Sequence, residues 1–430
     1  MDLNHLALPV ALALIVAKCL AELWLEHLNR RHVLAHADAV PPAFETTIDR
    51  PTYARSVDYT LARGKLHSIE FIYDLLVMLS LLATGLLPWS YRVAVGSFGT
   101  SIWAMAGYLF LVGLILALAA LPLQWYAQFR LEARFGFNTT TPATWLLDRV
   151  KGFLLAFALG YPLLALLLKL ASWAGDHWWL LAWATTTAFQ LVMMVVAPVL
   201  ILPLFNKFTP LPEGSLRARL LALAQRTHFQ AAGIQVMDGS KRSRHSNAFF
   251  TGFGRFRKVV LFDTLVGHLT EDELEAVLAH EIGHYRRRHI PKMMIWSSVS
   301  LLAGFYVLAL LAQQPGFQQS FGFPPDGLAP AFLLFGLLGG TITFWASPLI
   351  NLWSRRFEYQ ADAFGAHAVG GPHALIGALR KLTEKNLSNL TPHPLYSGFY
   401  YSHPTLIERE QALAAIPSPP GSPTQLSTGP

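Results

Sequence analysis

Cysteine and charge are both scarce in this 430-residue chain. Its single cysteine, Cys19, excludes an intrachain disulfide framework and a cysteine-based zinc site, so a bound metal must use histidine and carboxylate ligands. Only 14% of the residues are charged, whereas 53% are hydrophobic, and the mean hydropathy is +0.38. These values exclude an ordinary soluble enzyme of this length and predict an integral membrane protein.

Seven hydrophobic runs are long enough to cross a bilayer as helices of roughly 20 residues. They begin near Leu6, Ile69, Trp103, Phe153, Trp178, Met293 and Ala331. Prolines inside the runs, such as Pro162, Pro198 and Pro348, are compatible with kinked membrane helices. The first run has no basic segment before it and is too long for the apolar part of a signal peptide, so we interpret it as a retained span.

Basic residues give the chain a net charge of +7, and they cluster in particular loops. The loops after the first and third runs contain Arg30, Arg31, Arg50, Arg55, Arg63, Lys65, Arg130, Arg134, Arg149 and Lys151. Since the loops after the second, fourth and sixth runs contain almost none, the positive-inside rule places the N-terminus outside and the polar segments after the fifth and seventh runs in the cytoplasm. The sequence has no basic stretch interleaved with aromatic residues, so we expect a lipid bilayer and no nucleic acid as partner.

The polar segment after the fifth run predicts a small α+β domain. NKFTPLPEGSLRARLLALAQRTHF indicates a proline and glycine turn followed by a helix, and the residues from Ile234 to Val266 predict two or three short strands. LTEDELEAVLAHEIGHYRRRH then predicts a helix. Thr270 and Glu273 have the spacing of a capping box, and the charges at both ends match the helix dipole.

This helix carries the pattern HExxH. His280 and His284 are one turn apart, so both imidazoles project from one face and can bind the same ion. Glu281 is offset by about 100° and can act on a water at the ion without being a ligand. A chance match among 16 histidines is the alternative, but the capped helix favours the site of a metallopeptidase. We therefore predict one Zn²⁺ per chain.

A third protein ligand is needed, because catalytic zinc sites generally have three and keep one position open for water. The candidate is Glu358 in SRRFEYQADAFGAHA, directly after the seventh run, with Asp362 one turn later on the same face. Asp362 can accept a hydrogen bond from a ligating histidine and so fix its tautomer. For both carboxylates the alternative is an ion pair with Arg355 or another base on a solvated helix.

Together these segments resemble the type 1 CAAX prenyl protease family, zinc endopeptidases with seven membrane spans. The resemblance extends over nearly the whole chain apart from the tail, through EARFGFNTTTPATWLLDRVKG, PLFNKFTPLPEGSLR, SNAFFTGFG, VLAHEIGHYRRRH, SRRFEYQADAFGAHA and YSHPTLIER. It implies a mainly α-helical polytopic protein in which seven transmembrane helices enclose a water-filled chamber, with a small zincin-like domain. It also implies zinc bound by His280, His284 and Glu358, and Glu281 as general base and acid.

Three further site residues come from the resemblance. Asn247 lies in an implied edge strand that binds extended peptide, and otherwise it is a turn asparagine. His403 and Arg409 correspond to catalytic positions near the zinc, where they can stabilise the tetrahedral oxyanion; the alternatives are a loop histidine and a charge on a helix surface. The other histidines, which include His289, His367 and His393, we interpret as interfacial or surface residues.

The expected organisation is linear along the chain. A membrane region with five helices (1–204) precedes the metallopeptidase insert (205–289), a transmembrane hairpin (290–353), a cytoplasmic part with the third ligand (354–416) and a disordered tail (417–430).

The predicted activity is hydrolysis of peptide bonds in peptide or protein substrates, including prenylated or membrane-associated ones. Membrane protein quality control is a further predicted role of this activity. A non-proteolytic metal-binding protein or zinc transporter is the alternative, for which Lys18, Glu22, Glu70 and Asp74 supply charges within the runs. A bacterial inner membrane is favoured over the endoplasmic reticulum, with the active site toward the cytoplasm.

Overall fold

The computed structural model describes residues 6–230, 233–251, 258–325 and 327–416, so the predicted disordered tail lies outside the described residues. The chain is mainly α-helical and divides into two compact units. The first unit comprises Met1–Arg30, Ala62–Met193 and Met294–Ser347, and the second comprises Arg31–Leu61, Met194–Met293 and Pro348–Pro430.

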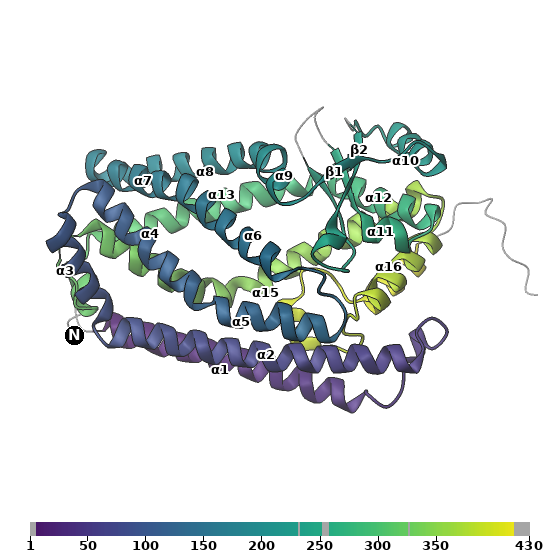
Figure 1. Cartoon of the computed structure of the whole chain (residues 1–430), viewed down its shortest axis with the longest axis horizontal. Coiled ribbons are helices and arrows are strands. Elements are labelled where there is room, and N and C mark those ends of the chain that lie inside the picture. The colour runs from purple at the N-terminus through teal and green to yellow at the C-terminus, as the bar shows by residue number, and fades with distance from the viewer. Residues whose placement is uncertain (1–5, 231–232, 252–257, 326, 417–430) are drawn as a thin grey trace, which may run out of the picture. The chain divides into compact units, whose positions relative to one another are not determined.

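Seven helices within the described residues are long and apolar enough to cross a membrane, which confirms the predicted number. They are Ala7–Ala35, Arg50–Ala83, Ile102–Glu132, Pro142–Trp173, Gly175–Phe205, His289–Ala312 and Leu328–Ala368. The first, second, sixth and seventh are the single helices α1, α2, α13 and α15 in Figure 1.

The third, fourth and fifth spans each combine α-helices with a π-helical turn. Their α-helical parts are α4 (Ile102–Ala119), α5 (Leu121–Tyr126), α6 (Pro142–Leu155), α7 (Tyr161–Trp173), α8 (Trp178–Val196) and α9 (Leu202–Phe205). Pro198 lies within the π turn Ala197–Ile201, and Pro162 is the second residue after the π turn Ala156–Gly160. A π turn shifts the hydrogen bonds by one residue and so accommodates a carbonyl that a proline leaves unpaired, and both spans continue past these prolines.

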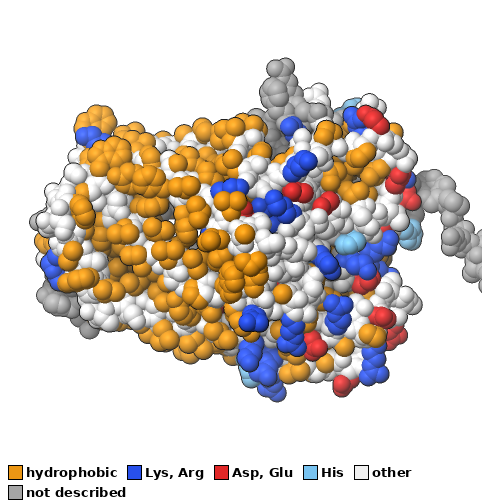
Figure 2. Space-filling model, viewed as in Figure 1, with side chains coloured by type: hydrophobic (Ala, Val, Ile, Leu, Met, Phe, Trp, Pro, Cys, Tyr) orange, Lys and Arg blue, Asp and Glu red, His pale blue; other side chains and the backbone are white. Residues whose placement is uncertain are grey.

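The first unit is apolar both inside and outside. Tyr108 and Leu109 of α4 and Leu168 of α7 are buried in its core, together with side chains from α3 (Leu86–Phe98). Hydrophobic side chains also cover the face of this unit that is in view in Figure 2, and large ones such as Leu111 are exposed. A soluble monomer rarely exposes such an extensive apolar surface, so a bilayer is its expected environment.

The second unit contains a four-stranded sheet with the order β1-β2-β4-β3. The strands are β1 (Phe208–Pro210), β2 (Gly233–Met237), β3 (Ala248–Thr251) and β4 (Lys258–Phe262). β2 and β4 are parallel, and the other two pairs are antiparallel. β2, β3 and β4 match the predicted strands, whereas β1 lies in the segment interpreted as a turn. Its Pro210 is tolerated because β1 is an edge strand.

The predicted HExxH helix is α12 (Glu271–Arg286), and it begins with the expected capping box. The Thr270 hydroxyl accepts from the Glu273 N–H at 3.3 Å, and the Glu273 carboxylate accepts from the Thr270 N–H at 2.8 Å. One face of α12 is buried against α10 (Ser215–Arg226), α11 (Asp263–His268) and the sheet. The core includes Leu220, Leu223, Leu261, Leu265, Leu274, Leu278 and Ile282.

The seventh span continues into the third-ligand segment, whereas the sequence predicts that it ends before it. α15 (Leu328–Ala368) is one helix of 41 residues, with Pro348 inside it, so its last turns belong to the second unit and carry Glu358 and Asp362. The remaining helices are α14 (Pro315–Ser320), α16 (His373–Lys385), α17 (Pro394–Tyr400) and α18 (Leu406–Ala414).

The end of α15 packs against α12 so closely that two glycines are required at the contact. A Cβ on Gly283 of α12 would lie 2.9 Å from Ala361 Cα, and a Cβ on Gly365 of α15 would lie 3.0 Å from the His280 nitrogen. Both neighbours are backbone atoms, which cannot move aside as a flexible side chain can. The sequence therefore allows the two backbones to touch where the site residues lie.

We predict that Gly283→Ala destabilises the protein by about 1–3 kcal/mol, because the added methyl overpacks this contact. Thermal unfolding of the purified protein in detergent measures the loss. Gly267→Ala is the matched control, since Gly267 is also helical and a Cβ there would meet no atom within 4 Å. Equal unfolding temperatures for the two variants would contradict the close contact.

Candidate metal centre

Three of the predicted site residues converge on one point in the second unit. His280, His284 and Glu358 each offer a ligand atom, and these atoms lie within 4.8 Å of one another. Nε2 of His284 is 3.2 Å from Nε2 of His280, and the Glu358 carboxylate lies 3.5 Å from His280 Nε2 and 3.3 Å from His284 Nε2. No other group of three such residues converges in the described part of the chain.

The donor set fits a divalent cation. His280 and Glu358 are buried, with 7% and 4% of their surface exposed, and Glu358 Oε2 has no hydrogen-bond partner among the described residues. When two imidazole nitrogens and a carboxylate direct lone pairs at one buried point, these lone pairs repel one another unless a proton or a metal cation lies between them. Two histidines and one glutamate also match the ligands and number that a catalytic zinc site requires.

Asp362 and Arg409 fix the orientation of His280. The His280 Nδ1–H donates to Asp362 Oδ1 at 2.8 Å, because a carboxylate can only accept, and this leaves the Nε2 lone pair facing Glu358. Arg409 of α18 donates to both oxygens of Asp362, at 2.8 and 2.5 Å. Arg409 is buried, so it is not a charge on the helix surface, and Asp362 is not a surface ion pair.

Glu281 follows His280 on α12 and shares the electrostatic surroundings of the cluster. Loss of solvation raises the pKa of its carboxyl above the usual value of a glutamate, whereas His280 and His284 act in the opposite direction. A raised pKa suits a group that must both take up and release a proton near neutral pH.

His403 also reaches the cluster, from the loop after α17. Its Nε2 lies 3.4 Å from Glu358 Oε1, and 63% of its side chain is exposed. Two residues of α15 hold this region through backbone carbonyl groups: Arg355 donates to Tyr401 in the loop at 2.7 Å, and Asn351 donates to Phe399 in α17 at 2.6 Å. The guanidinium of Arg355 therefore binds backbone carbonyl groups and is not the ion-pair partner of Glu358 that the sequence left open.

Asn247 lies apart from the cluster. Its exposed side chain accepts a hydrogen bond from the Ala248 N–H at 2.8 Å, directly before the edge strand β3. The structure thus places Asn247 at the start of an edge strand, as the resemblance implies, without bringing it into contact with the three converging residues.

The prediction that His289 is an interfacial or surface residue is wrong. Only 1% of its surface is exposed, and its Nδ1 lies 3.1 Å from Nδ1 of His284. α12 ends at Arg286, and Arg288 then adopts a left-handed conformation (φ 56°), so the chain reverses and the His289 ring turns back toward the cluster. The sequence signal that could have indicated this is a histidine five residues after His284. His367, by contrast, is exposed as expected.

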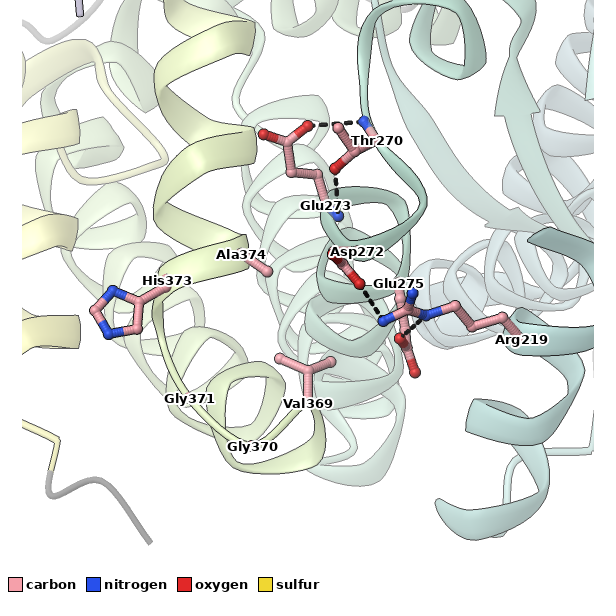
Figure 3. A pocket seen from close by; sticks show the side chains of 10 residues that line it. All are labelled: Arg219, Thr270, Asp272, Glu273, Glu275, Val369, Gly370, Gly371, His373 and Ala374. Atoms are coloured by element: carbon pink, nitrogen blue, oxygen red, sulfur yellow. Dashed lines mark hydrogen bonds and ion pairs between the residues drawn. The ribbon is translucent and has the colours of Figure 1, made fainter. Parts of the chain in front are cut away.

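A cavity of about 480 Å³ lies at the start of α12, next to the connection between α15 and α16. Figure 3 shows Arg219 reaching Asp272 and Glu275. Glu273 forms an ion pair with Lys381, 2.8 Å away. Because these carboxylates are already neutralised by basic side chains, the cavity does not resemble a second metal site.

Known proteins resemble this chain over most of its length. A family model described as CAAX prenyl protease N-terminal, five membrane helices, matches residues 29–207, and one described as Peptidase family M48 matches residues 210–416. CAAX prenyl protease 1 of Saccharomyces cerevisiae is 37% identical over 401 residues, covering 87% of this chain and 88% of the yeast protein. A CAAX prenyl protease 1 homolog of Oryza sativa subsp. japonica is 34% identical, covering 95% of this chain and 98% of the rice protein.

A solved structure agrees with the fold. The crystal structure of S. mikatae Ste24p has a TM-score of 0.90 with this chain at 34% identity, covering 96% of this chain and 99% of that one. The predicted fold class, a mainly α-helical polytopic membrane protein with a small α+β part, is confirmed.

We predict that Arg409→Ala destabilises the protein by about 3–5 kcal/mol, because it leaves the Asp362 carboxylate buried without its cationic partner. Thermal unfolding in detergent measures the effect. Arg380→Ala is the matched control, since Arg380 also binds a carboxylate, that of Glu410, through two nitrogens but is more exposed. An Arg409→Ala variant no less stable than Arg380→Ala would show that the buried pair does not hold the site together.

Proposed function

Because the chain belongs to peptidase family M48, we propose that it is a zinc-dependent membrane endopeptidase of the gluzincin type, with HExxH and a glutamate as zinc ligands. Membership makes it a multi-pass membrane metalloprotease that acts on peptide or protein substrates, and it gives no support to the transporter alternative. The observation that carries the zinc proposal is the convergence of His280, His284 and Glu358 on one buried point.

We assign the metal to His280, His284 and Glu358. A bound zinc ion supplies Lewis-acid polarisation of the scissile carbonyl and of the attacking water. Asp362 keeps the proton of His280 on Nδ1, so that Nε2 is free to bind, and Arg409 holds Asp362 in place through two hydrogen bonds.

Proton transfer falls to Glu281. Its carboxylate accepts the proton of the attacking water and then delivers it to the amine that leaves the cleaved peptide bond. His403 is exposed beside Glu358, where its ring can donate to the oxyanion that forms at the carbonyl. Two nitrogens of Arg409 donate to Asp362, and its contact with the oxyanion stays a prediction.

For the substrate, we propose an extended peptide that pairs with the edge strand β3 near Asn247, through main-chain hydrogen bonds. The names of the yeast and rice relatives point to substrates that end in a prenylated cysteine followed by three residues. The distribution of basic loops supports a site that faces the cytoplasm. Yeast and rice are both eukaryotes, so the preference for a bacterial inner membrane stays a prediction.

Glu281→Gln is predicted to retain zinc and to lose peptide cleavage by at least about 100-fold, because an amide cannot carry the proton. The assay is cleavage of a panel of otherwise identical peptides, with and without a prenylated cysteine, by the purified protein. Glu271→Gln, on the same helix but distant from the cluster, is the control. Undiminished cleavage by Glu281→Gln would remove Glu281 from the mechanism, and equal cleavage of both peptide classes would remove the requirement for prenylation.

Glu358→Ala is predicted to lower zinc from about one ion per chain to a small fraction, because three protein ligands are the usual minimum of a catalytic site. Metal analysis of the protein after gel filtration gives the stoichiometry. Glu384→Ala on α16 serves as the control, since Glu384 pairs with Lys385 beside it and is not one of the three converging residues. Zinc content equal to that of the control would assign the third ligand to another residue.

A further inference from the structure

His289 is a buried polar side chain to which the mechanism above gives no task. It is the first residue of α13, and its ring stacks on Phe357 with centroids 4.1 Å apart and planes 11° apart. Phe357 directly precedes Glu358 on α15, so His289 is held against the same turn that supplies the third ligand.

Both ring nitrogens of His289 have partners. Nδ1 lies 3.1 Å from Nδ1 of His284, and Nε2 lies 3.1 Å from Oε1 of Gln360. His284, His289 and Gln360 thus form a line of hydrogen bonds. It starts at Nδ1 of the proposed ligand His284 and ends at the amide oxygen of Gln360, which is an exposed residue.

The direction of the hydrogen bonds along this line follows from its end. The Gln360 oxygen can only accept, so the proton of a neutral His289 is on Nε2, and Nδ1 is an acceptor. The bond between the two histidines then requires the proton of His284 on Nδ1. His284 Nε2 consequently carries a lone pair, which faces Glu358. The reverse direction would place a proton on His284 Nε2 and prevent it from binding a metal.

We propose that His289, oriented by Gln360, is a positioning residue that keeps His284 in the tautomer that binds the metal. The inference rests on the proposed ligand set of His280, His284 and Glu358. The two ligating histidines thereby have different partners, since Asp362 orients His280 and a neutral imidazole orients His284. A neutral partner avoids a further buried negative charge beside Glu281 and Glu358.

The test compares zinc affinities, measured by competition with a chelator. His289→Phe retains an aromatic ring against Phe357 but has no acceptor, and we expect it to bind zinc about 10–100-fold more weakly than the wild type. His289→Asn places an amide oxygen near the position of Nδ1 and should restore most of the affinity. His367→Phe is the matched control, because His367 is an exposed histidine whose Nδ1 bonds to a carbonyl of its own helix.

Gln360 provides a second variant that does not disturb the core, so the test holds even if His289→Phe fails to fold. Gln360→Lys replaces the acceptor by a donor and should weaken zinc binding, whereas Gln360→Glu keeps an acceptor and should not. A loss in Gln360→Lys with retention in Gln360→Glu supports the proposal, and wild-type affinity in Gln360→Lys overturns it.

The thermal unfolding temperature of each metal-free variant separates positioning from folding. If His289 and Gln360 position His284, the variants bind zinc more weakly while their unfolding temperature is unchanged. If the two residues only stabilise the fold, the unfolding temperature falls as well. A zinc-free wild type would overturn the proposed function and this inference with it, while a zinc-binding wild type matched in affinity by Gln360→Lys overturns the inference alone.

Discussion

The contact between α12 and α15 is the constraint on which the site depends. Gly283 and Gly365 let the two backbones meet, and only at that distance can the Glu358 carboxylate lie within 3.5 Å of both imidazoles. The three donor atoms repel one another at this spacing, so the helix contact and a bound cation stabilise each other. Metal binding is thus coupled to the packing of the second unit.

The parts of the site that depend on local chain geometry could be predicted from the sequence. The capping box at Thr270 and the one-turn spacing of His280 and His284 are properties of a single helix, and the structure has both. The position of Asp362 one turn after Glu358 follows from the same reasoning, and Asp362 does bind His280. The seven spans follow from length and hydropathy in the same way.

The parts that depend on tertiary packing could not be predicted. The burial of His289 requires the left-handed turn at Arg288 and the ring of Phe357, which lies on another helix. Arg355, which by sequence is a candidate ion-pair partner for Glu358, instead donates to the carbonyl of Tyr401 in the loop that carries His403. The strand β1 exists because β2 offers it an edge, which no local pattern in FTP reveals.

Anomalous scattering at the zinc absorption edge, measured on crystals of the wild-type protein, tests the central claim most directly. The account predicts a single peak per chain, about 2.0–2.2 Å from Nε2 of His280, Nε2 of His284 and a carboxylate oxygen of Glu358. A peak held by other residues, or no peak in a protein that cleaves peptides, would contradict it.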